Sequence, residues 1–306
     1  MTNGLFQVPD SYNEPAHSYA PGSPERALLK AELERQYREE VEVPLVIGGK
    51  EIRTGRLGRM TCPHDHAHVL GHYHEAGEAE VRLAIDAALR AKKAWESMPW
   101  EDRAAIFHKV ASLISDRYRF RMNAATMLGQ SKNAFQAEID SACEATDFFR
   151  YNVKFMEQIY ANQPLSTANT WNRVHYRALE GFVFAVTPFN FTAIAANLPT
   201  SPALMGNTVV WKPASTSILS NYHLMKIYQE AGLPDGVINF VPGRGSLMSR
   251  IILDHPSLAG IHFTGSTGVF NGMWKTVGEN LGRYVIYPRL IGETGGKDYI
   301  FVHQSA

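Results

Sequence analysis

The sequence predicts an α/β protein whose core is a doubly wound, parallel sheet. Between residues 182 and 263, four short apolar segments alternate with helical stretches. Strands that are apolar on both faces are typical of a sheet covered by helices on both sides, and βαβ units of this kind build a Rossmann-like fold. The four expected strands are FVFAV (182–186), TVVW (208–211), VINFV (237–241) and GIHF (260–263), and the helices that follow them are expected at about 191–205, 217–231, 245–253 and 267–281.

A helical and hairpin region precedes this sheet. Residues 1–22 are rich in Pro, Ser, Asn and Gly, so we expect an extended arm. The tripeptide Ser23-Pro24-Glu25 then predicts a helix start, with Ser as N-cap, Pro in the first turn and Glu near the positive end of the helix dipole. Alternating segments at 43–54 and 67–74 predict strands at a sheet edge.

Three long helical patterns follow, near residues 76–97, 100–128 and 134–160, and residues 171–179 read as a strand. The third helical pattern defines an apolar stripe typical of a helix packed on a core. Its members are Ile139, Ala142, Cys143, Phe149 and Val153.

Composition narrows the class of partner. Of the 306 residues, 30 are basic and 30 acidic, so no net charge attracts nucleic acid or an anionic membrane. No apolar run of 18 residues predicts a membrane span, and the N-terminus lacks the pattern of a leader peptide. Two cysteines cannot build a disulfide framework, which favours a reducing compartment. We therefore expect a cytoplasmic protein.

Polar residues follow the predicted strands at their carboxyl ends, where ligands bind in such a sheet. Thr187, Pro188, Phe189 and Asn190 come directly after the first strand. The amide of Asn190 is suited to donate to a developing oxyanion, but an asparagine at this place could equally cap the next helix. The sequence leaves both interpretations open.

The other three strands also end in candidate ligand-binding turns. Lys212 and Ser215 follow the second strand, where the lysine could reach ribose hydroxyls or phosphate, or be an ordinary surface lysine. Gly245 lies in a flexible turn after the third strand. Gly265 and Ser266 open a helix after the fourth, and a helix N-terminus is suited to a pyrophosphate. Because no Gly-x-Gly-x-x-Gly fingerprint is present, the glycines alone are a weak indication.

The last candidate site residue is a carboxylate. Glu293 lies between glycines in IGETGGKDYI (291–300). The segments TPFNF, VVWKPAS, FTGSTG and GETGGKD, in this order and spacing, resemble the aldehyde dehydrogenase superfamily. The flanking text, including EGFVFAVTPFNFTAIAANLP and YVIYPRLIGETGGKDYIFVHQSA, is most similar to the branch that oxidises L-glutamate γ-semialdehyde with NAD in proline degradation.

The resemblance implies a role for each candidate residue. Asn190 matches the asparagine of the oxyanion hole, and Glu293 matches the base that activates water for thioester hydrolysis. The cofactor-binding set implied for NAD is Thr187, Pro188, Phe189, Lys212, Ser215, Gly245, Gly265 and Ser266. Within it, Lys212 matches the lysine of the adenosine ribose and Ser266 the pyrophosphate contact. Ser215 stands where many members carry a ribose-binding glutamate, so the preference for NAD over NADP comes from the branch and not from this residue.

The resemblance also implies a domain organisation. Residues 1–40 would form an arm and helix, 41–288 an NAD-binding domain and 289–306 the beginning of a catalytic domain. Residues 163–180 would contribute to oligomerisation strands, which implies a homo-oligomer. The family's nucleophilic cysteine lies in a GQKCSA-like motif beyond GETGGKD, and these 306 residues contain no such motif. We therefore expect this chain alone to be inactive. A non-catalytic nucleotide-binding fragment or pseudoenzyme is the alternative.

Two further patterns suggest chemistry but favour structural roles. His64, His66 and His68 follow Cys62 with a period of two, which places them on one face of an extended segment and is compatible with zinc. The spacing fits no closed four-ligand signature, so we expect a strand pair and no metal site. Cys143 lies on the apolar helical stripe, so we expect a buried, inert thiol.

Overall fold

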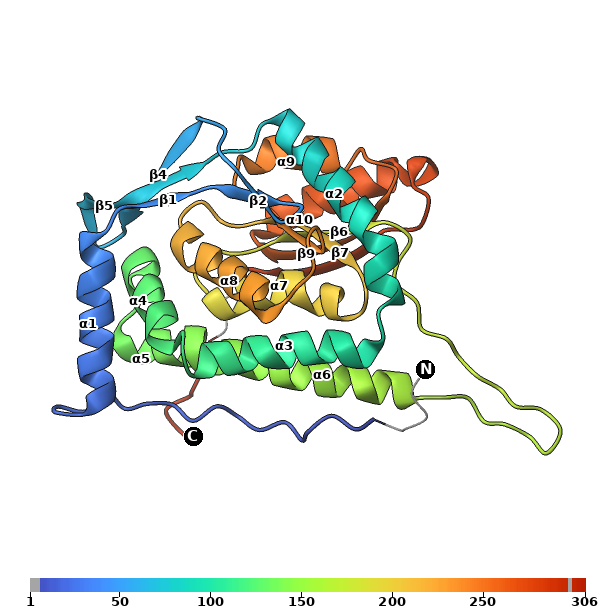
Figure 1. Cartoon of the computed structure of the whole chain (residues 1–306), viewed down its shortest axis with the longest axis horizontal. Coiled ribbons are helices and arrows are strands. Elements are labelled where there is room, and N and C mark those ends of the chain that lie inside the picture. Colours follow the sequence, from blue (N-terminus) through green and yellow to red (C-terminus); the bar gives the residue numbers. More distant parts are fainter. Residues whose placement is uncertain (1–5, 297–298) are drawn as a thin grey trace.

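The computed structural model describes residues 6–296 and 299–306 (Figure 1). Within this part of the chain, seven strands form one sheet in the order β10-β9-β6-β7-β8-β2-β3. The five strands from β10 to β8 are parallel, whereas β2 runs antiparallel to β8 and to β3. Their bounds are β2 (Leu45–Ile47), β3 (Lys50–Ile52), β6 (Phe182–Val186), β7 (Thr208–Lys212), β8 (Ile238–Phe240), β9 (Leu258–Gly265) and β10 (Arg289–Thr294). The predicted parallel sheet is confirmed.

Helices cover both faces of this sheet, as its two-sided apolar strands require. One face packs against α2 (Glu78–Ser97), α9 (Gly245–Ile252) and α10 (Thr267–Glu279), and the other against α7 (Thr192–Leu204) and α8 (Ile218–Ala231). Alternate residues of β6 serve the two cores: Phe182 and Phe184 join the first, and Val183 and Ala185 the second. Because successive side chains of a strand point to opposite faces, one short strand supports both layers.

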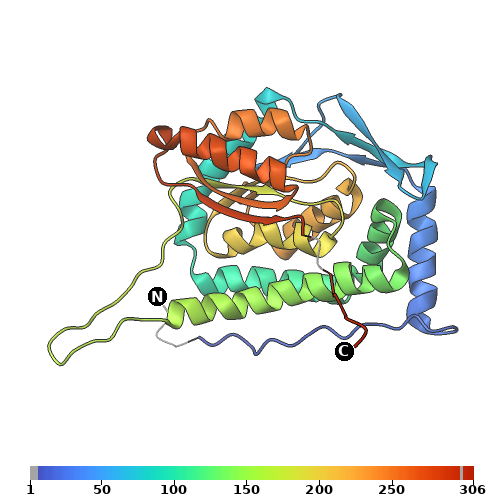
Figure 2. The ribbon, with the colours of Figure 1, turned by 180° about the vertical axis from the view of Figure 1, so that it is seen from behind.

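A further helical layer lies outside α7 and α8 (Figures 1 and 2). The single helix expected over 100–128 is wrong, because the chain breaks into α3 (Trp100–Ser115) and α4 (Arg119–Gln130). The pattern at 134–160 becomes α5 (Ala134–Ala137), the π-helix η1 (Glu138–Glu144) and α6 (Ala145–Ala161). A π-turn holds more residues than an α-turn and so rotates the register of the faces.

That rotation corrects the predicted apolar stripe. Cys143, together with Ala142, Phe149 and Val153, is buried as expected. Ile139 is instead 40% exposed, while its neighbours Glu138 and Asp140 are 0% and 1% exposed. The π-helix therefore turns two carboxylates inward at the place where an α-helix would have turned an isoleucine.

The N-terminal region adds a helix and a small sheet. The helix start predicted at Ser23 is confirmed: α1 runs Pro24–Arg38, and the Ser23 hydroxyl accepts from the Arg26 N–H. The two strand segments expected at 43–54 and 67–74 divide further than predicted. They become β1 (Val41–Val43), β2, β3 and β5 (Asp65–His74), and β4 (Leu57–Cys62) completes the second sheet in the order β1-β5-β4.

The segment between α6 and β6 is a projecting loop (Figure 2). The strand expected at 171–179 is wrong for this structure, in which the segment holds only an isolated bridge between Thr167 and Thr170. Leu165 and Trp171 are 92% and 78% exposed. A strand needs a neighbouring strand for its hydrogen bonds, and none of the described residues offers one here. A contribution to oligomerisation strands stays a prediction.

The extended arm lies along the outer helical layer (Figure 1). Its backbone N–H groups donate to carboxylates on η1 and α6, which replace the partners that a sheet would supply. The donor and acceptor pairs are Val8 to Glu157, Glu14 to Asp147 and His17 to Glu138.

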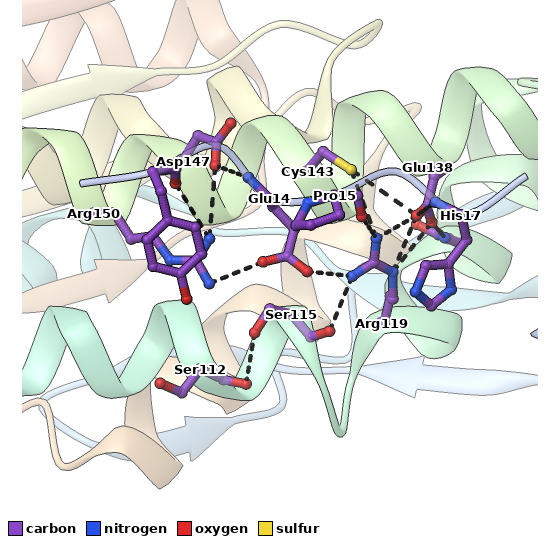
Figure 3. A network of polar contacts seen from close by, with 12 residues as sticks. Glu14, Pro15, His17, Ser112, Ser115, Arg119, Glu138, Cys143, Asp147 and Arg150 are labelled. Atoms are coloured by element: carbon purple, nitrogen blue, oxygen red, sulfur yellow. Dashed lines mark hydrogen bonds and ion pairs between the residues drawn. The ribbon is translucent and has the colours of Figure 1, made fainter. Parts of the chain in front are cut away.

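A buried ion pair fastens the arm at its centre (Figure 3). The guanidinium of Arg119 contacts Glu138 and donates to Glu14 Oε1 at 2.6 Å. Tyr19 and Asn123 donate to the other oxygen of Glu138 at 2.5 and 2.7 Å. Each lone pair of this buried carboxylate thus has a donor, which offsets the cost of removing it from water.

The last strand, β10, pairs in parallel with β9 from Arg289 to Thr294. The segment expected to open a catalytic domain therefore begins as the edge strand of the main sheet. The domain boundary expected after residue 288 stays a prediction, and the residues that follow β10 include positions 297 and 298, which lie outside the described residues. No helix among the residues that the structure describes is long and apolar enough to span a membrane.

Candidate cofactor and catalytic site

The carboxyl ends of the parallel strands lie in register. Lys212 pairs with Val186, Val186 with Phe263, and Phe263 with Gly292. One residue further along each chain, Thr187, Thr264 and Glu293 form the next row. Neighbouring strands lie about 4.8 Å apart, so Glu293 is roughly 10 Å, or two strand spacings, from the turn after β6. The topology thus brings together residues that are more than a hundred positions apart.

The topology also marks where a ligand binds. From β6 the chain proceeds to β7 and β8 on one side, and then crosses to β9 and β10 on the other. Such a reversal of strand order leaves a crevice between the turns that follow the two central strands. The turns at 187–190 and 264–266 border this crevice, so the predicted catalytic and cofactor residues lie at the expected edge.

Asn190 is exposed, and its side chain makes no hydrogen bond to any residue in the described ranges. The N-cap of α7 is Phe191, and the capping carboxylate is that of Asp140, which accepts from the N–H groups of Thr192 and Ala193 at 3.0 and 2.8 Å. Of the two interpretations that the sequence leaves open, the helix-cap role is therefore wrong. The amide stays available for a ligand.

The rest of this turn is held firmly. Thr187 is buried, and its hydroxyl accepts from the Trp211 indole N–H at 3.0 Å. The Pro188 carbonyl accepts from the Ser217 hydroxyl at 3.4 Å. Phe189 is 64% exposed, beside the buried Thr187 and Pro188 of the same turn. A fixed backbone with one exposed aromatic ring is suited to pack against a planar ligand.

Lys212 ends β7 with most of its side chain buried. Burial lowers the pKa of its ammonium to about 8, and its Nζ donates to the Pro213 carbonyl at 2.8 Å. No other partner within the described ranges contacts Nζ, although an ammonium has three N–H donors. A Cβ built on Gly245 would lie 3.7 Å from Lys212 Cε, so the first residue of α9 borders this side chain closely.

The turn after β9 offers a helix N-terminus. Ser266 is the exposed N-cap of the 13-residue helix α10, and its side chain makes no cap hydrogen bond. A Cβ on Gly265 would lie 2.7 Å from Phe263 Cζ, so a larger residue does not fit there without movement. Ser215 is exposed after β7.

Glu293 is exposed on β10 and accepts from the Thr264 hydroxyl at 3.1 Å. Its charge reaches a second carboxylate, because burial, then Asp140, and also Glu293 raise the pKa of Glu144. Lys132 acts in the opposite direction on the same group. Glu144 is half-buried and makes no hydrogen bond to any residue of the described ranges.

Asp140, Glu144 and Lys132 are site residues that the sequence reasoning missed. Lys132 Nζ lies 2.7 Å from Asp140 Oδ2 and 3.8 Å from the centre of the Phe191 ring. The available signal was the run Glu138-Ile-Asp140-Ser-Ala-Cys-Glu144, in which three acidic residues interrupt an apolar stripe. Such a run on an ordinary helix would be a solvated face, and only the π-helix turns it inward.

Both thiols of the sequence are buried elsewhere in the fold. Burial and the nearby Asp65 raise the pKa of Cys62 to about 11. Burial and then Glu138 raise the pKa of Cys143 to about 12, against the effect of Arg119. A thiol that stays protonated is a poor nucleophile, so the structure agrees with the prediction that Cys143 packs in the core.

The histidines after Cys62 have separate partners. His64 Nδ1 contacts the Ser131 hydroxyl at 2.8 Å, the ring of His68 stacks on Tyr37 at 3.6 Å, and His74 Nε2 contacts Glu42 at 2.7 Å. Across residues 6–296 and 299–306, no three His, Cys, Asp or Glu side chains converge as metal ligands would. These residues belong to β4, β5 and the turn between them, in agreement with the predicted strand pair.

The residues present fit a dinucleotide. A buried ammonium with unused donors, a glycine that leaves room beside it and a free helix N-terminus lie along one edge of the sheet. These are the groups that bind ribose hydroxyls and pyrophosphate. The fold is thus that of an α/β nucleotide-binding protein, with an exposed amide and an exposed carboxylate at the same edge of the sheet.

Comparison with known proteins narrows the class. Residues 53–306 match the model of the aldehyde dehydrogenase family, and the chain belongs to that family. It is 54% identical over 303 residues to the Δ1-pyrroline-5-carboxylate dehydrogenase of Agaricus bisporus, covering 98% of this chain and 55% of that protein. It is 48% identical to the mitochondrial Δ1-pyrroline-5-carboxylate dehydrogenase of Dictyostelium discoideum, over 97% of this chain and 54% of that protein.

A solved structure agrees with these relatives. The Δ1-pyrroline-5-carboxylate dehydrogenase of Mycobacterium tuberculosis, bound with NAD, superimposes with a TM-score of 0.96 at 51% identity. The match covers 97% of this chain and 56% of that one. The chain thus spans about half the length of the relatives it matches.

Proposed function

We propose that these residues are the cofactor-binding part of an NAD-dependent dehydrogenase that oxidises L-glutamate γ-semialdehyde, which arises from Δ1-pyrroline-5-carboxylate, to L-glutamate. The single observation that carries this proposal is the row of ligand-binding groups along the carboxyl edge of the sheet. Glu293, Ser266, Asn190 and Lys212 occur there in the order of strands β10, β9, β6 and β7.

In this proposal the cofactor extends along that edge. NAD, when bound, accepts a hydride from the aldehyde carbon. Lys212 would donate to the adenosine ribose hydroxyls beside Gly245, which replaces the hydrogen bonds that its buried ammonium lost to water. Ser266 and the first turn of α10 would bind the pyrophosphate, and Phe189 would lie against the nicotinamide side. Gly265, Ser215, Thr187 and Pro188 would line the cofactor along the same edge.

Asn190 and Glu293 would act on the substrate. The Asn190 amide would donate to the carbonyl oxygen as negative charge develops there, and its freedom from other hydrogen bonds leaves both N–H groups for this task. The Glu293 carboxylate would remove a proton from the water that releases the acid product. Thr264 holds one Glu293 oxygen and leaves the other accessible.

Glu144 supports an amino-acid aldehyde as substrate. Glutamate γ-semialdehyde carries an ammonium, and the half-buried carboxylate of Glu144, which has no hydrogen-bond donor among the described residues and whose pKa responds to the charge of Glu293, offers it a partner. An ion pair with the substrate would relieve the cost of burying that carboxylate. The three relatives compared above are named as dehydrogenases of pyrroline-5-carboxylate, the compound from which this aldehyde arises.

The alternative of a non-catalytic nucleotide-binding module has one observation in its favour. Cys62 and Cys143 are the two cysteines of the sequence, and both are buried with raised pKa values, away from the row of site residues. We therefore expect these 306 residues alone to bind NAD weakly and to turn over no aldehyde.

The test compares two proteins. Calorimetry with NAD on the 306-residue chain should give weak binding or none, and its mixture with glutamate γ-semialdehyde should give no NADH. The product of the complete reading frame should form NADH from this aldehyde and more slowly from butyraldehyde, which has no ammonium. Asn190→Ala in that product should lower kcat by about 100-fold. If the complete product forms no NADH, the proposed substrate is wrong. If the 306-residue chain turns over the aldehyde, the reaction does not need the nucleophilic cysteine of the family's GQKCSA-like motif, and the expectation of an inactive chain is wrong.

Assembly and compartment belong to the proposal as well. The exposed Leu165 and Trp171 on the projecting loop fit contact with a second copy, so we propose a homo-oligomer. The composition favours the cytoplasm, whereas the Dictyostelium relative is named mitochondrial.

A further inference from the structure

The N-terminus of α7 depends on a residue far away in the sequence. Phe191 at the N-cap position has no side-chain acceptor, so the first N–H groups of the helix lack a local partner. Asp140 supplies both of its oxygens to them, Oδ2 to the Thr192 N–H and Oδ1 to the Ala193 N–H. The loop that carries Asn190 ends where this contact begins.

The Asp140 carboxylate also holds Lys132, whose ammonium contacts the Phe191 ring at the end of the loop. Lys132 Nζ lies 2.7 Å from Asp140 Oδ2, and its charge lies over the Phe191 ring at 3.8 Å. The ion pair neutralises the aspartate, which as a free anion would oppose an oxyanion developing near Asn190. Asp140 thereby holds the residue after Asn190 both through the backbone and through Lys132.

The π-helix determines the direction in which the Asp140 side chain points. Its neighbours are anchored on α4: Glu138 joins Arg119 in the buried network (Figure 3). The Ser141 hydroxyl donates to Asn123 Oδ1 at 2.8 Å. With residues on both sides held on α4, the intervening side chain points at α7. A π-turn inside an α-helix costs stability and commonly marks a functional position.

The cap also has a chemical consequence. Because the N–H groups of Thr192 and Ala193 already donate to Asp140, they are not available to a substrate oxygen. These two amides therefore do not serve the oxyanion, and the donor that the proposed function gives to this loop is the Asn190 side chain, whose position follows from the loop.

We propose that Asp140 is a positioning residue of the catalytic site, which holds the 187–191 loop and so places the Asn190 amide against the substrate oxygen. The inference rests on the proposed function for its catalytic part, and its structural part stands independently of it. Asp140 does not touch substrate. It acts through the backbone of α7 and through Lys132.

A matched control exists on the same helical segment. Asp147 also accepts two donors, the Glu14 N–H at 2.7 Å and the Asn13 side-chain amide at 2.8 Å, but it binds the N-terminal arm. Asp147→Asn therefore removes a comparable carboxylate without touching α7. Asp140→Asn keeps one acceptor oxygen, and Asp140→Ala keeps none, so the two variants should form a graded series.

Amide hydrogen exchange on the 306-residue chain tests the structural part without requiring activity. Asp140→Ala should accelerate exchange at Thr192 and Ala193 by about 10-fold, Asp140→Asn by less, and Asp147→Asn only at the arm. Unchanged exchange at these two amides in Asp140→Ala would overturn the proposal.

Steady-state kinetics on the product of the complete reading frame test the catalytic part. Asp140→Asn should lower kcat by about 10-fold, less than loss of Asn190 itself, while the KM for NAD stays within about 2-fold. Asp147→Asn should leave kcat unchanged. Equal kcat values for Asp140→Asn and Asp147→Asn would overturn the positioning role, because a merely structural defect would affect both alike. If the unmodified product forms no NADH, the proposed function fails, and the exchange measurement still decides whether Asp140 holds the loop.

Discussion

Replacing Lys212 by methionine should make the folded chain more stable at neutral pH. Methionine keeps most of the buried stem and removes the ammonium. Burial lowers the pKa of Lys212 from 10.5 to about 8, and this difference corresponds to ~3 kcal/mol of free energy by which the fold disfavours the charged form. The hydrogen bond to the Pro213 carbonyl offsets about 1 kcal/mol of that penalty. Lys212→Met should therefore raise the free energy of unfolding by ~2 kcal/mol.

The direction of the Lys212 pKa shift determines how this gain in stability depends on pH. The pKa of Lys212 is lower in the folded than in the unfolded chain, so the unfolded chain holds the proton more tightly. The penalty is fully present below pH 8, decreases as the pH rises from about 8 to 10.5, and is absent above that range. The stability difference between the variant and the unmodified chain should follow the same course.

Urea unfolding at several pH values measures the effect. Lys275→Met is the control, because Lys275 is exposed and its i,i+4 contact with Glu279 is 3.8 Å long, so its removal should change stability by less than about 0.5 kcal/mol. A Lys212→Met chain that is less stable than the unmodified chain at pH 7, or a gain that persists undiminished at pH 11, would refute the reasoning. A stabilised variant with weaker NAD binding would indicate that the ammonium is retained for function.

Three further predictions concern the buried polar groups and the buried thiols. Arg119→Met should destabilise the chain by about 3–5 kcal/mol, because it leaves the carboxylate of Glu138 buried without its cation. Protease cleavage within the N-terminal arm should become faster in this variant. An arm that resists cleavage as well as before would contradict the prediction. Burial alone would raise the pKa of Glu138, but Arg119, Tyr19 and the His17 N–H hold it below its ordinary value, so the contribution of this pair should be lost as the pH falls through that lowered pKa. Cys62 and Cys143 should not react with a thiol reagent at pH 8 until the chain is unfolded, since burial raises both pKa values; labelling of the folded chain would show that one thiol is accessible.

Much of the fold around the parallel strands could be predicted, because the sequence patterns that mark these strands and helices are local. The strands from 182 to 265 are short apolar runs bounded by turn residues, and the helix at Ser23 begins with a capping side chain and a proline. The turns that carry Asn190, Lys212 and Ser266 follow those strands directly in the sequence. Since parallel strands present their carboxyl ends at one edge, assigning the strands also assigned the edge.

Predictions failed where the backbone departs from a regular period. The pattern over 134–160 predicts one α-helix, and an α-helix would bury Ile139. The π-helix instead buries Glu138 and Asp140, and its stability comes from donors on α4, α7 and the arm that are distant in the sequence. No local pattern contains those partners. The strand expected at 171–179 failed for the related reason that a strand exists only with a neighbour.

Asn190 illustrates what the sequence determines and what only the tertiary structure determines. The sequence by itself determined that an asparagine follows a buried strand and precedes a helix, and that Glu293 lies among glycines. Only the tertiary structure decided that Asp140 caps that helix, so that the asparagine amide has no hydrogen-bond partner among the residues that the structure describes. Local order along the chain fixes which groups can reach the edge of the sheet. Which of them remain free there depends on how long-range contacts satisfy the buried hydrogen-bonding groups around them.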